Sequence, residues 1–245
     1  MRCVVPWVLL AMSSAHAADC ERASSVGKDF IVCRADVSRD RVEIAYAGED
    51  GKPFGNFEAL RRAYAGRGLA LKFAMNAGMF HPDFRPVGLL VIGGQTLAPI
   101  NRGSGYGNFF MQPNGVFMLD ADGAQVLATH EFRNHSPRFA TQSGPLLLDR
   151  GMLPDTVAFR ANSTSRHVRN GVCAPTPAQV ALVISEDKVN LHEFARFFRD
   201  RLQCTEALFL DGSISSLYAP ALKRADRHSA LGPMIAVVEQ ATPEN

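Results

Sequence analysis

Short apolar runs separated by polar turns dominate this chain of 245 residues and predict many β-strands. Most of the runs stop at Gly, Asn or Asp, residues that favour turns. The predicted strands cover residues 30–37, 41–47, 69–75, 87–92, 115–119, 125–129, 139–148, 179–185, 207–210 and 233–238. Two hairpins are expected, one around residues 38–40 and one around residues 120–123.

Two segments have the periodicity of helices instead. The first covers residues 57–64, with Asn56 as its N-cap and glycines after its end. The second begins at Asn190, where Glu193 completes a capping box, and continues to about Gln203 with apolar residues on one face. Strands outnumber helices and do not alternate with them as βαβ units require. The predicted fold class is therefore α+β, a single domain with a large mixed β-sheet system and few helices.

The start of the chain predicts a secretory signal. Arg2 is positively charged, residues 3–12 are apolar but too short to span a bilayer, and Ala15-His16-Ala17 fits the small-residue cleavage rule. We therefore predict a signal peptide at residues 1–17 and one domain at 18–245. Because no later segment is apolar and long enough to cross a membrane, we expect a periplasmic or secreted protein without membrane insertion after signal cleavage.

The balance of basic and acidic residues limits the kinds of partner that this protein is expected to bind. The chain has 26 basic and 24 acidic residues, and removal of Arg2 with the signal leaves 25 against 24. Such a balance argues against a general nucleic-acid binder or a binder of anionic membranes. No Pro/Ser-rich linker or charge block divides the chain, which favours one domain.

Four cysteines remain after the signal: Cys20, Cys33, Cys173 and Cys204. An even number in an exported protein indicates two disulfides, for which three pairings exist. Sequence proximity favours Cys20–Cys33 and Cys173–Cys204. The Cys-x-x-Cys spacing of zinc and redox sites is absent.

Polar residues gather where predicted strands end. The candidates are Asn76 and Gly78; Gln142, Ser143 and Gly144; Arg166, Arg169, Asn170 and Gly171 in a predicted basic turn; and Asp211, Gly212 and Ser213. Uncharged hydrogen-bonding groups with one carboxylate and one or two arginines indicate a small polar ligand that carries an anionic group. The six histidines beyond the signal lack metal-ligand spacing and no dinucleotide or Walker motif is present, so neither a metal nor a cofactor is expected.

Four motifs in this order resemble the phosphodiester glycosidase family. They are Asn76-Ala77-Gly78-Met79-Phe80, Gln142-Ser143-Gly144-Pro145-Leu146, Arg169-Asn170-Gly171 and Leu210-Asp211-Gly212-Ser213-Ile214-Ser215-Ser216. The resemblance covers roughly residues 40–238. It departs from the family at Ser213 and Ile214, where glycines are frequent, and at Asn170, where a Thr often follows the arginine.

The resemblance implies an exported hydrolase that cleaves the bond between a sugar anomeric carbon and a phosphodiester oxygen, as in bacterial relatives linked to exopolysaccharide. It implies Asp211 as base or nucleophile and Arg169 as a phosphate clamp, because a guanidinium suits phosphate geometry. The remaining motif residues would bind the carbohydrate phosphodiester: Asn76, Gly78, Gln142, Ser143, Gly144, Asn170, Gly212 and Ser213. Glu58 is a possible second carboxylate.

Two other functions stay open on the sequence. The departures at Ser213 and Ile214 are compatible with a non-catalytic glycan-binding protein that uses the same pocket. A metal-dependent phosphodiesterase that cuts the phosphorus–oxygen bond is the third possibility, for which the sequence offers no metal-ligand cluster.

Overall fold

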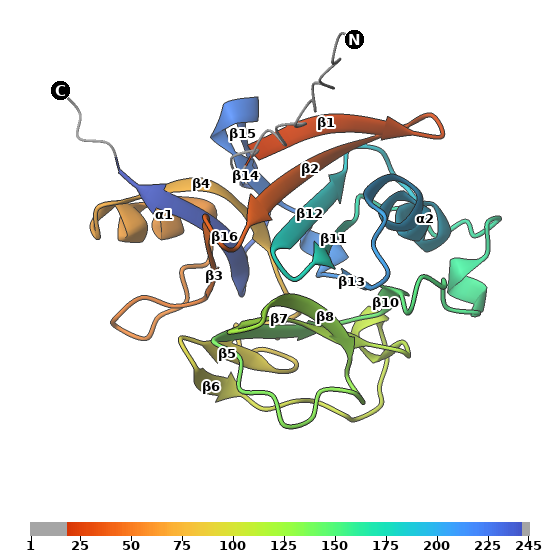
Figure 1. Ribbon diagram of the computed structural model, residues 1–245, viewed down its shortest axis with the longest axis horizontal. Coiled ribbons are helices and arrows are strands. Elements are labelled where there is room, and N and C mark those ends of the chain that lie inside the picture. Colours follow the sequence, from red (N-terminus) through yellow and green to blue (C-terminus); the bar gives the residue numbers. More distant parts are fainter. Residues whose placement is uncertain (1–18, 242–245) are drawn as a thin grey trace, which may run out of the picture.

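Three antiparallel sheets form the framework of residues 19–241, the part of the chain that the computed structural model describes (Figure 1). The first sheet has the strand order β1 (Asp19–Ser25), β2 (Lys28–Asp36), β12 (Gln179–Ser185), β11 (Asn170–Thr176), β13 (Ala207–Phe209), β10 (Leu146–Leu148). The second has the order β15 (Arg224–Ala225), β14 (Leu217–Ala219), β4 (Leu69–Asn76), β16 (Met234–Gln240), β3 (Arg41–Ala45). The third has the order β6 (Gln95–Ala98), β5 (Leu90–Ile92), β9 (Phe139–Ser143), β7 (Gly115–Asp120), β8 (Gly123–Ala128).

Each α-helix covers one sheet, and both are as the sequence predicts. Helix α1 (Phe57–Ala65) begins where the Asn56 side chain accepts a hydrogen bond from the Ala59 N–H at 2.8 Å, and its apolar face packs on the second sheet. Helix α2 (Leu191–Leu202) begins with the predicted capping box and packs on the first sheet. The predicted sheet-rich α+β fold with few helices is confirmed.

The core lies where the three sheets face one another. One cluster of buried side chains contains Ile31 from the first sheet, Ile44 and Phe73 from the second, and Phe117 from the third. Burial of such side chains is the main favourable contribution to folding. Figure 1 shows the third sheet below this junction, with α1 and α2 on opposite sides of the molecule.

One predicted hairpin is right and the other is wrong. Strands β7 and β8 pair around residues 120–123, as expected. The predicted hairpin around residues 38–40 does not form, because β2 pairs with β1 and β12 whereas β3 pairs with β16 in another sheet. Both strands are buried, so local alternation of residues could not identify their partners.

Two further segments differ from their predictions. The apolar run at 139–148 is two strands in different sheets, β9 and β10, because Pro145 has no N–H with which to continue a ladder. The predicted basic turn at 166–171 is wrong at its end, since Asn170 and Gly171 already belong to β11 and pair with β12.

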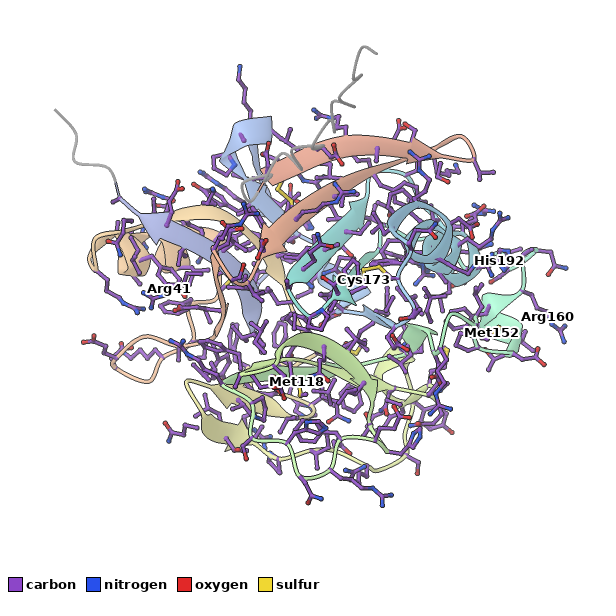
Figure 2. The ribbon with its side chains drawn as sticks, viewed as in Figure 1. Arg41, Met118, Met152, Arg160, Cys173 and His192 are labelled. Atoms are coloured by element: carbon purple, nitrogen blue, oxygen red, sulfur yellow. A yellow bond between two sulfur atoms is a disulfide. The ribbon has the colours of Figure 1, made fainter. Side chains whose placement is uncertain are left out.

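Both favoured disulfide pairings are confirmed. Cys20–Cys33 joins directly opposed positions of β1 and β2. Cys173–Cys204 joins β11 to the segment that follows α2 (Figure 2). Disulfides are typical of proteins that fold in an oxidising compartment. Within residues 19–241, no helix is long and apolar enough to cross a membrane. The predicted signal peptide at 1–17 lies outside the described residues.

Removal of the Cys173–Cys204 disulfide is expected to destabilise the protein more than removal of Cys20–Cys33. The bridges close chain segments with sequence separations of 31 and 13 residues. Loop-closure entropy gives about 4 and about 3 kcal/mol of stabilisation respectively. Urea unfolding of the Cys173→Ser/Cys204→Ser and Cys20→Ser/Cys33→Ser variants measures both losses. A free energy of unfolding unchanged in the first variant would contradict the prediction.

Candidate active site

The four polar segments predicted from the sequence meet at one place in the fold. The Asp211 N–H donates to the Ala77 carbonyl at 3.1 Å, and the Leu210 N–H donates to the Asn170 carbonyl at 3.1 Å. On the other side of β13, the Phe209 N–H donates to the Pro145 carbonyl at 3.0 Å. Backbone hydrogen bonds thus bring the ends of β4, β11 and β13 together with the segment between β9 and β10.

Two fully buried asparagines form the centre of this junction. Asn170 Nδ2 donates to Oδ1 and to the backbone carbonyl of Asn76, each at 3.0 Å. Asn76 Nδ2 donates to the Asp211 carbonyl at 2.8 Å, and its Oδ1 accepts from the Ser216 N–H at 2.8 Å. Ser215 Oγ donates to Asn170 Oδ1 at 3.2 Å. The amides therefore hold the backbone of the Asp211 turn in place.

Asp211 lies at the end of β13, where a short 3₁₀ turn, Gly212–Ile214, begins. Its side chain is buried and accepts a hydrogen bond from Ser213 Oγ at 2.7 Å. Burial raises the pKa of the Asp211 carboxyl above its ordinary value, and the hydrogen bonds from Ser213 partly oppose that shift. A raised carboxyl pKa in a polar junction is typical of groups that transfer protons or attack a substrate.

Arg169 lies just outside the same pair of strands. β11 pairs with β13 as far as Gly171 opposite Phe209, and Arg169 and Asp211 each lie two residues beyond that last pair. The Arg169 side chain is only 3% exposed and its guanidinium lies over the Phe209 ring, 5.3 Å from the centroid. Arg169 Nε and Nη2 donate to the carbonyls of Val189 and Ser165, each at 2.9 Å.

No carboxylate compensates this buried cation within the described part of the chain. The shift of Arg169 has desolvation as its only cause, and no charged group contributes to the shift of Asp211. Burial lowers the pKa of the Arg169 guanidinium to about 10, so it stays protonated at neutral pH. The two opposite charges are thus at one end of neighbouring strands without forming an ion pair, and Nη1 has no protein acceptor among the described residues.

Gln142 belongs to the junction but its amide is saturated by the protein. Its Oε1 accepts from the backbone N–H groups of Leu89 and Asn101, and its Nε2 donates to the Asn101 carbonyl and to Thr129 Oγ1. This geometry favours a role in fixing the loop before Asn101 to β9, not the substrate contact that the sequence predicts. Ser143, in contrast, has a buried Oγ that makes no hydrogen bond in the described structure.

Three of the predicted site glycines allow close packing between protein segments. A Cβ at Gly78 would lie 2.4 Å from the Gln142 carbonyl oxygen, and one at Gly144 would lie 2.6 Å from the Phe109 carbonyl oxygen. At Gly212 it would lie 2.3 Å from the Phe209 ring. Their close neighbours are thus protein atoms, which the sequence does not reveal.

Two predicted candidates lie elsewhere. Arg166 forms a bidentate ion pair with Glu193 at the start of α2, at 2.7 and 2.9 Å. Glu58 lies on the exposed first turn of α1 and pairs with Arg61, so it does not join Asp211. Sequence reasoning assigned no role to Thr141, although its Oγ1 accepts from the Gly78 N–H at 3.2 Å. In the sequence, the sign of this role is the position of Thr141 one residue before the predicted site residue Gln142.

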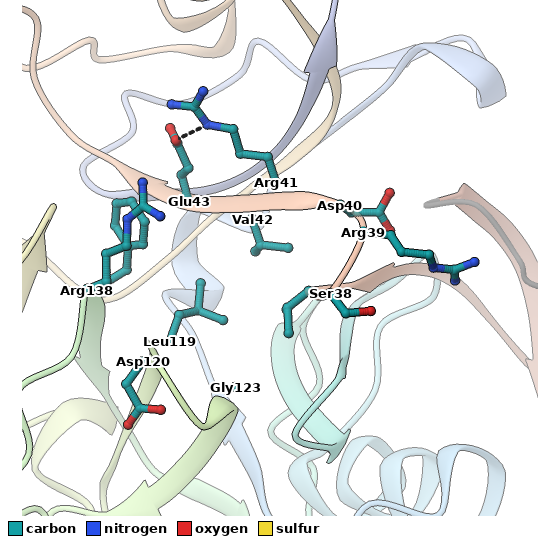
Figure 3. A pocket seen from close by; sticks show the side chains of 12 residues that line it. Ser38, Arg39, Asp40, Arg41, Val42, Glu43, Leu119, Asp120, Gly123 and Arg138 are labelled. Carbon is teal, nitrogen blue, oxygen red and sulfur yellow. Dashed lines mark hydrogen bonds and ion pairs between the residues drawn. The ribbon is translucent and has the colours of Figure 1, made fainter.

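A separate cavity of about 340 Å³ lies where β3 meets the ends of β7 and β9 (Figure 3). The Arg41 side chain donates a hydrogen bond to Glu43 there, and the Arg138 guanidinium lies over the Phe139 ring, 5.3 Å from its centroid. None of the predicted site residues lines this cavity. Across residues 19–241, no group of three or more His, Cys, Asp or Glu side chains could hold a metal ion.

Comparison with known proteins identifies the family of this chain. The family described as phosphodiester glycosidase (NAGPA) matches residues 70–237. An uncharacterised Escherichia coli protein, YigE, is 31% identical over 180 residues, which are 73% of this chain and 70% of that protein. The catalytic domain of zebrafish N-acetylglucosamine-1-phosphodiester alpha-N-acetylglucosaminidase, auto-inhibited by its pro-peptide, has a similar fold. It is 14% identical with a TM-score of 0.62 and covers 92% of this chain and 84% of its own. The matched residues include all four motifs at the junction, and the chain belongs to the phosphodiester glycosidase family.

Proposed function

We propose that this protein is an exported glycosidase that hydrolyses the sugar–phosphate bond of a sugar-1-phosphodiester in a glycan or glycolipid. The observation that carries the proposal is the junction itself, where Asp211 and Arg169 are buried just beyond the same end of neighbouring strands, without an ion pair in the described structure. Isolated buried charges are unfavourable for folding, so two of them at one junction favour a functional site there. A substrate phosphate would supply the anion that Arg169 lacks.

The chemistry needs only a few groups. The bond between the anomeric carbon and the phosphodiester oxygen breaks, and its electron pair leaves with the phosphate monoester. Arg169 stabilises that charge as it develops, so the leaving oxygen needs less protonation than an alcohol would. Asp211 takes a proton from the attacking water, or attacks the anomeric carbon itself and is then released by water. In both routes the oxygen of water ends on the sugar.

The remaining site residues fall into two groups. Ser213 is exposed, and its hydroxyl, which donates to Asp211, is placed to bind a sugar hydroxyl. Ser143 Oγ has no partner in the described structure, but it is fully buried and a sugar would reach it only if neighbouring groups moved. Asn76, Asn170 and Gln142 are positioning residues, because their amides are engaged by the protein. The sequence predicted that these three residues contact the substrate. We propose instead that their amides hold the neighbouring site residues in place.

The compartment and the first substrate to test follow from other observations. Two disulfides and the predicted signal peptide support export to the periplasm or beyond the cell. The zebrafish enzyme is named for its action on N-acetylglucosamine-1-phosphodiesters. A methyl diester of N-acetylglucosamine 1-phosphate is therefore a suitable first substrate for this chain.

The purified mature protein is expected to release free sugar from that diester. Asp211→Asn should lower kcat by about 10²–10⁴-fold with folding intact, because the reacting carboxylate is lost. Asp155→Asn, a matched change at an exposed position, is the control. Reducing-sugar release, followed with circular dichroism of each variant, makes the measurement. Near-normal turnover by Asp211→Asn would remove Asp211 from the mechanism.

Labelled water separates the alternatives in the same assay. Hydrolysis at the anomeric carbon puts ¹⁸O into the sugar, whereas a phosphodiesterase puts it into the phosphate. Saccharide binding without turnover, across a panel of sugar-1-phosphodiesters, would instead identify a glycan-binding protein and overturn the proposal.

Asp211→Asn is also expected to change stability with pH in a defined direction. Because burial raises the Asp211 pKa, ionisation of this group destabilises the folded state above the folded pKa and has no such effect below the ordinary value of 3.8. The free energy of unfolding of the variant, relative to wild type, should therefore increase as pH rises from about 3 to 7. Urea unfolding at a series of pH values tests this. If the free energy of unfolding of the variant relative to wild type fell as pH rose, the Asp211 carboxylate would stabilise the fold, which would contradict this prediction.

A further inference from the structure

A cavity of about 380 Å³ lies between the first turn of α1 and strands β14 and β15, and no role has been assigned to it. Phe57 and Tyr218 form its aromatic wall, with ring centroids 6.2 Å apart and planes inclined by 40°. Tyr218 is half-buried and lines the cavity. A partly exposed aromatic ring in a concave site is a platform on which the apolar face of a sugar ring can pack.

The charges at this cavity leave a positive surplus. Its two carboxylates are already engaged by arginines outside the lining: Asp226 by Arg224 at 2.9 and 3.2 Å, and Glu58 by Arg61 at 2.9 and 3.1 Å. Two lining arginines remain. Arg62 pairs with Glu58 at 3.5 Å, and Arg227 makes no ion pair within the described residues, although the Glu58 carboxylate attracts it. Glu58 is thus shared among three arginines, and an anion at the cavity would meet guanidinium groups whose charge this one carboxylate only partly balances.

The cavity adjoins the Asp211 turn. Ile214 is the last residue of the 3₁₀ turn that begins at Gly212, and it packs into the apolar cluster that contains Phe57 and Tyr218. Tyr218 itself lies on β14, which starts at Leu217, three residues after Ile214. A glycan bound with one sugar at Asp211 therefore has a second concave surface close by.

We propose that this cavity binds a sugar ring that carries an anionic group, with Tyr218 against the ring and Arg62 and Arg227 on the anion. That this ring belongs to the glycan cleaved at Asp211 rests on the proposed function. Guanidinium groups pair well with both carboxylate and phosphate. The cavity would thus select an acidic glycan over a neutral one.

Calorimetry on the whole mature protein tests the binding without any need for turnover. The probes are a trisaccharide with one glucuronic acid, its methyl ester, and the same trisaccharide with a 6-phosphate in place of the carboxylate. The acidic probes should bind at least about tenfold more tightly than the ester, because a charge-assisted pair contributes 1.5 kcal/mol or more. The acidic probe that binds more tightly shows whether the cavity prefers a carboxylate or a phosphate.

Variants test whether the cavity causes this difference in affinity between the acidic probes and the ester. Arg62→Ala/Arg227→Ala should remove the preference for the acid, and Tyr218→Leu should weaken acid and ester alike. Arg160→Ala removes an exposed arginine from a distant segment, labelled in Figure 2, and should bind as wild type does. Thermal unfolding checks that each variant is folded, and Arg227→Glu provides a second test at an exposed position.

The outcomes separate this inference from the proposed function. Equal binding of acid and ester, or an unchanged preference in the double arginine variant, overturns the cavity proposal even if the simple diester is cleaved. Binding of inorganic phosphate alone, with no gain from the sugar, also overturns it. Acid-selective binding that depends on Arg227, with no diester cleaved, supports the cavity and counts against the proposed hydrolysis.

Discussion

The hydrogen bonds between Asn76 and Asn170 are the interaction on which the rest of the site depends. Asn76 ends an internal strand of the second sheet and Asn170 begins an internal strand of the first, so the pair joins the two sheets at the ends of these strands. Two residues after Asn76, the Gly78 N–H bonds to Thr141 of the third sheet. A buried amide without partners would cost about 1–3 kcal/mol, so each of these groups has a strong preference for this one arrangement. The Asp211 turn is fixed because it completes the same network.

Features that depend on neighbouring residues could be predicted from the sequence, whereas features that depend on residues far away in sequence could not. Both helices follow from their asparagine caps, and the hairpin of β7 and β8 follows from its aspartate–glycine turn, because those signals act within a few residues. The four site segments could be found as polar residues at strand ends. Their partners could not, since the division of β2 and β3 between two sheets depends on contacts with β12 and β16, far away in sequence. Burial of Arg169 was hidden for the same reason.

The roles of the polar residues also required the structure. An asparagine or glutamine near a strand end has the same appearance in sequence whether it binds a ligand or the protein itself. Gln142 makes four hydrogen bonds to protein atoms, whereas the hydroxyl of neighbouring Ser143 makes none. Adjacent residues on a strand point to opposite faces, so one serves the loop outside the sheet and the other faces inward. Hydrogen-bond saturation, not residue type, is what separates positioning residues from those left for a ligand.

The same reasoning explains why the two charges of the site remain apart. If Asp211 and Arg169 paired directly, the attraction between them would offset part of the desolvation penalty of each, and the site would bind a phosphate only by breaking that pair. Arg169 is instead held by two backbone carbonyls and the Phe209 ring, and Asp211 by the Ser213 hydroxyl. These neutral partners fix the direction of each charged group without cancelling its charge. Both charges are therefore oriented before a ligand arrives, which reduces the reorganisation that binding and catalysis require.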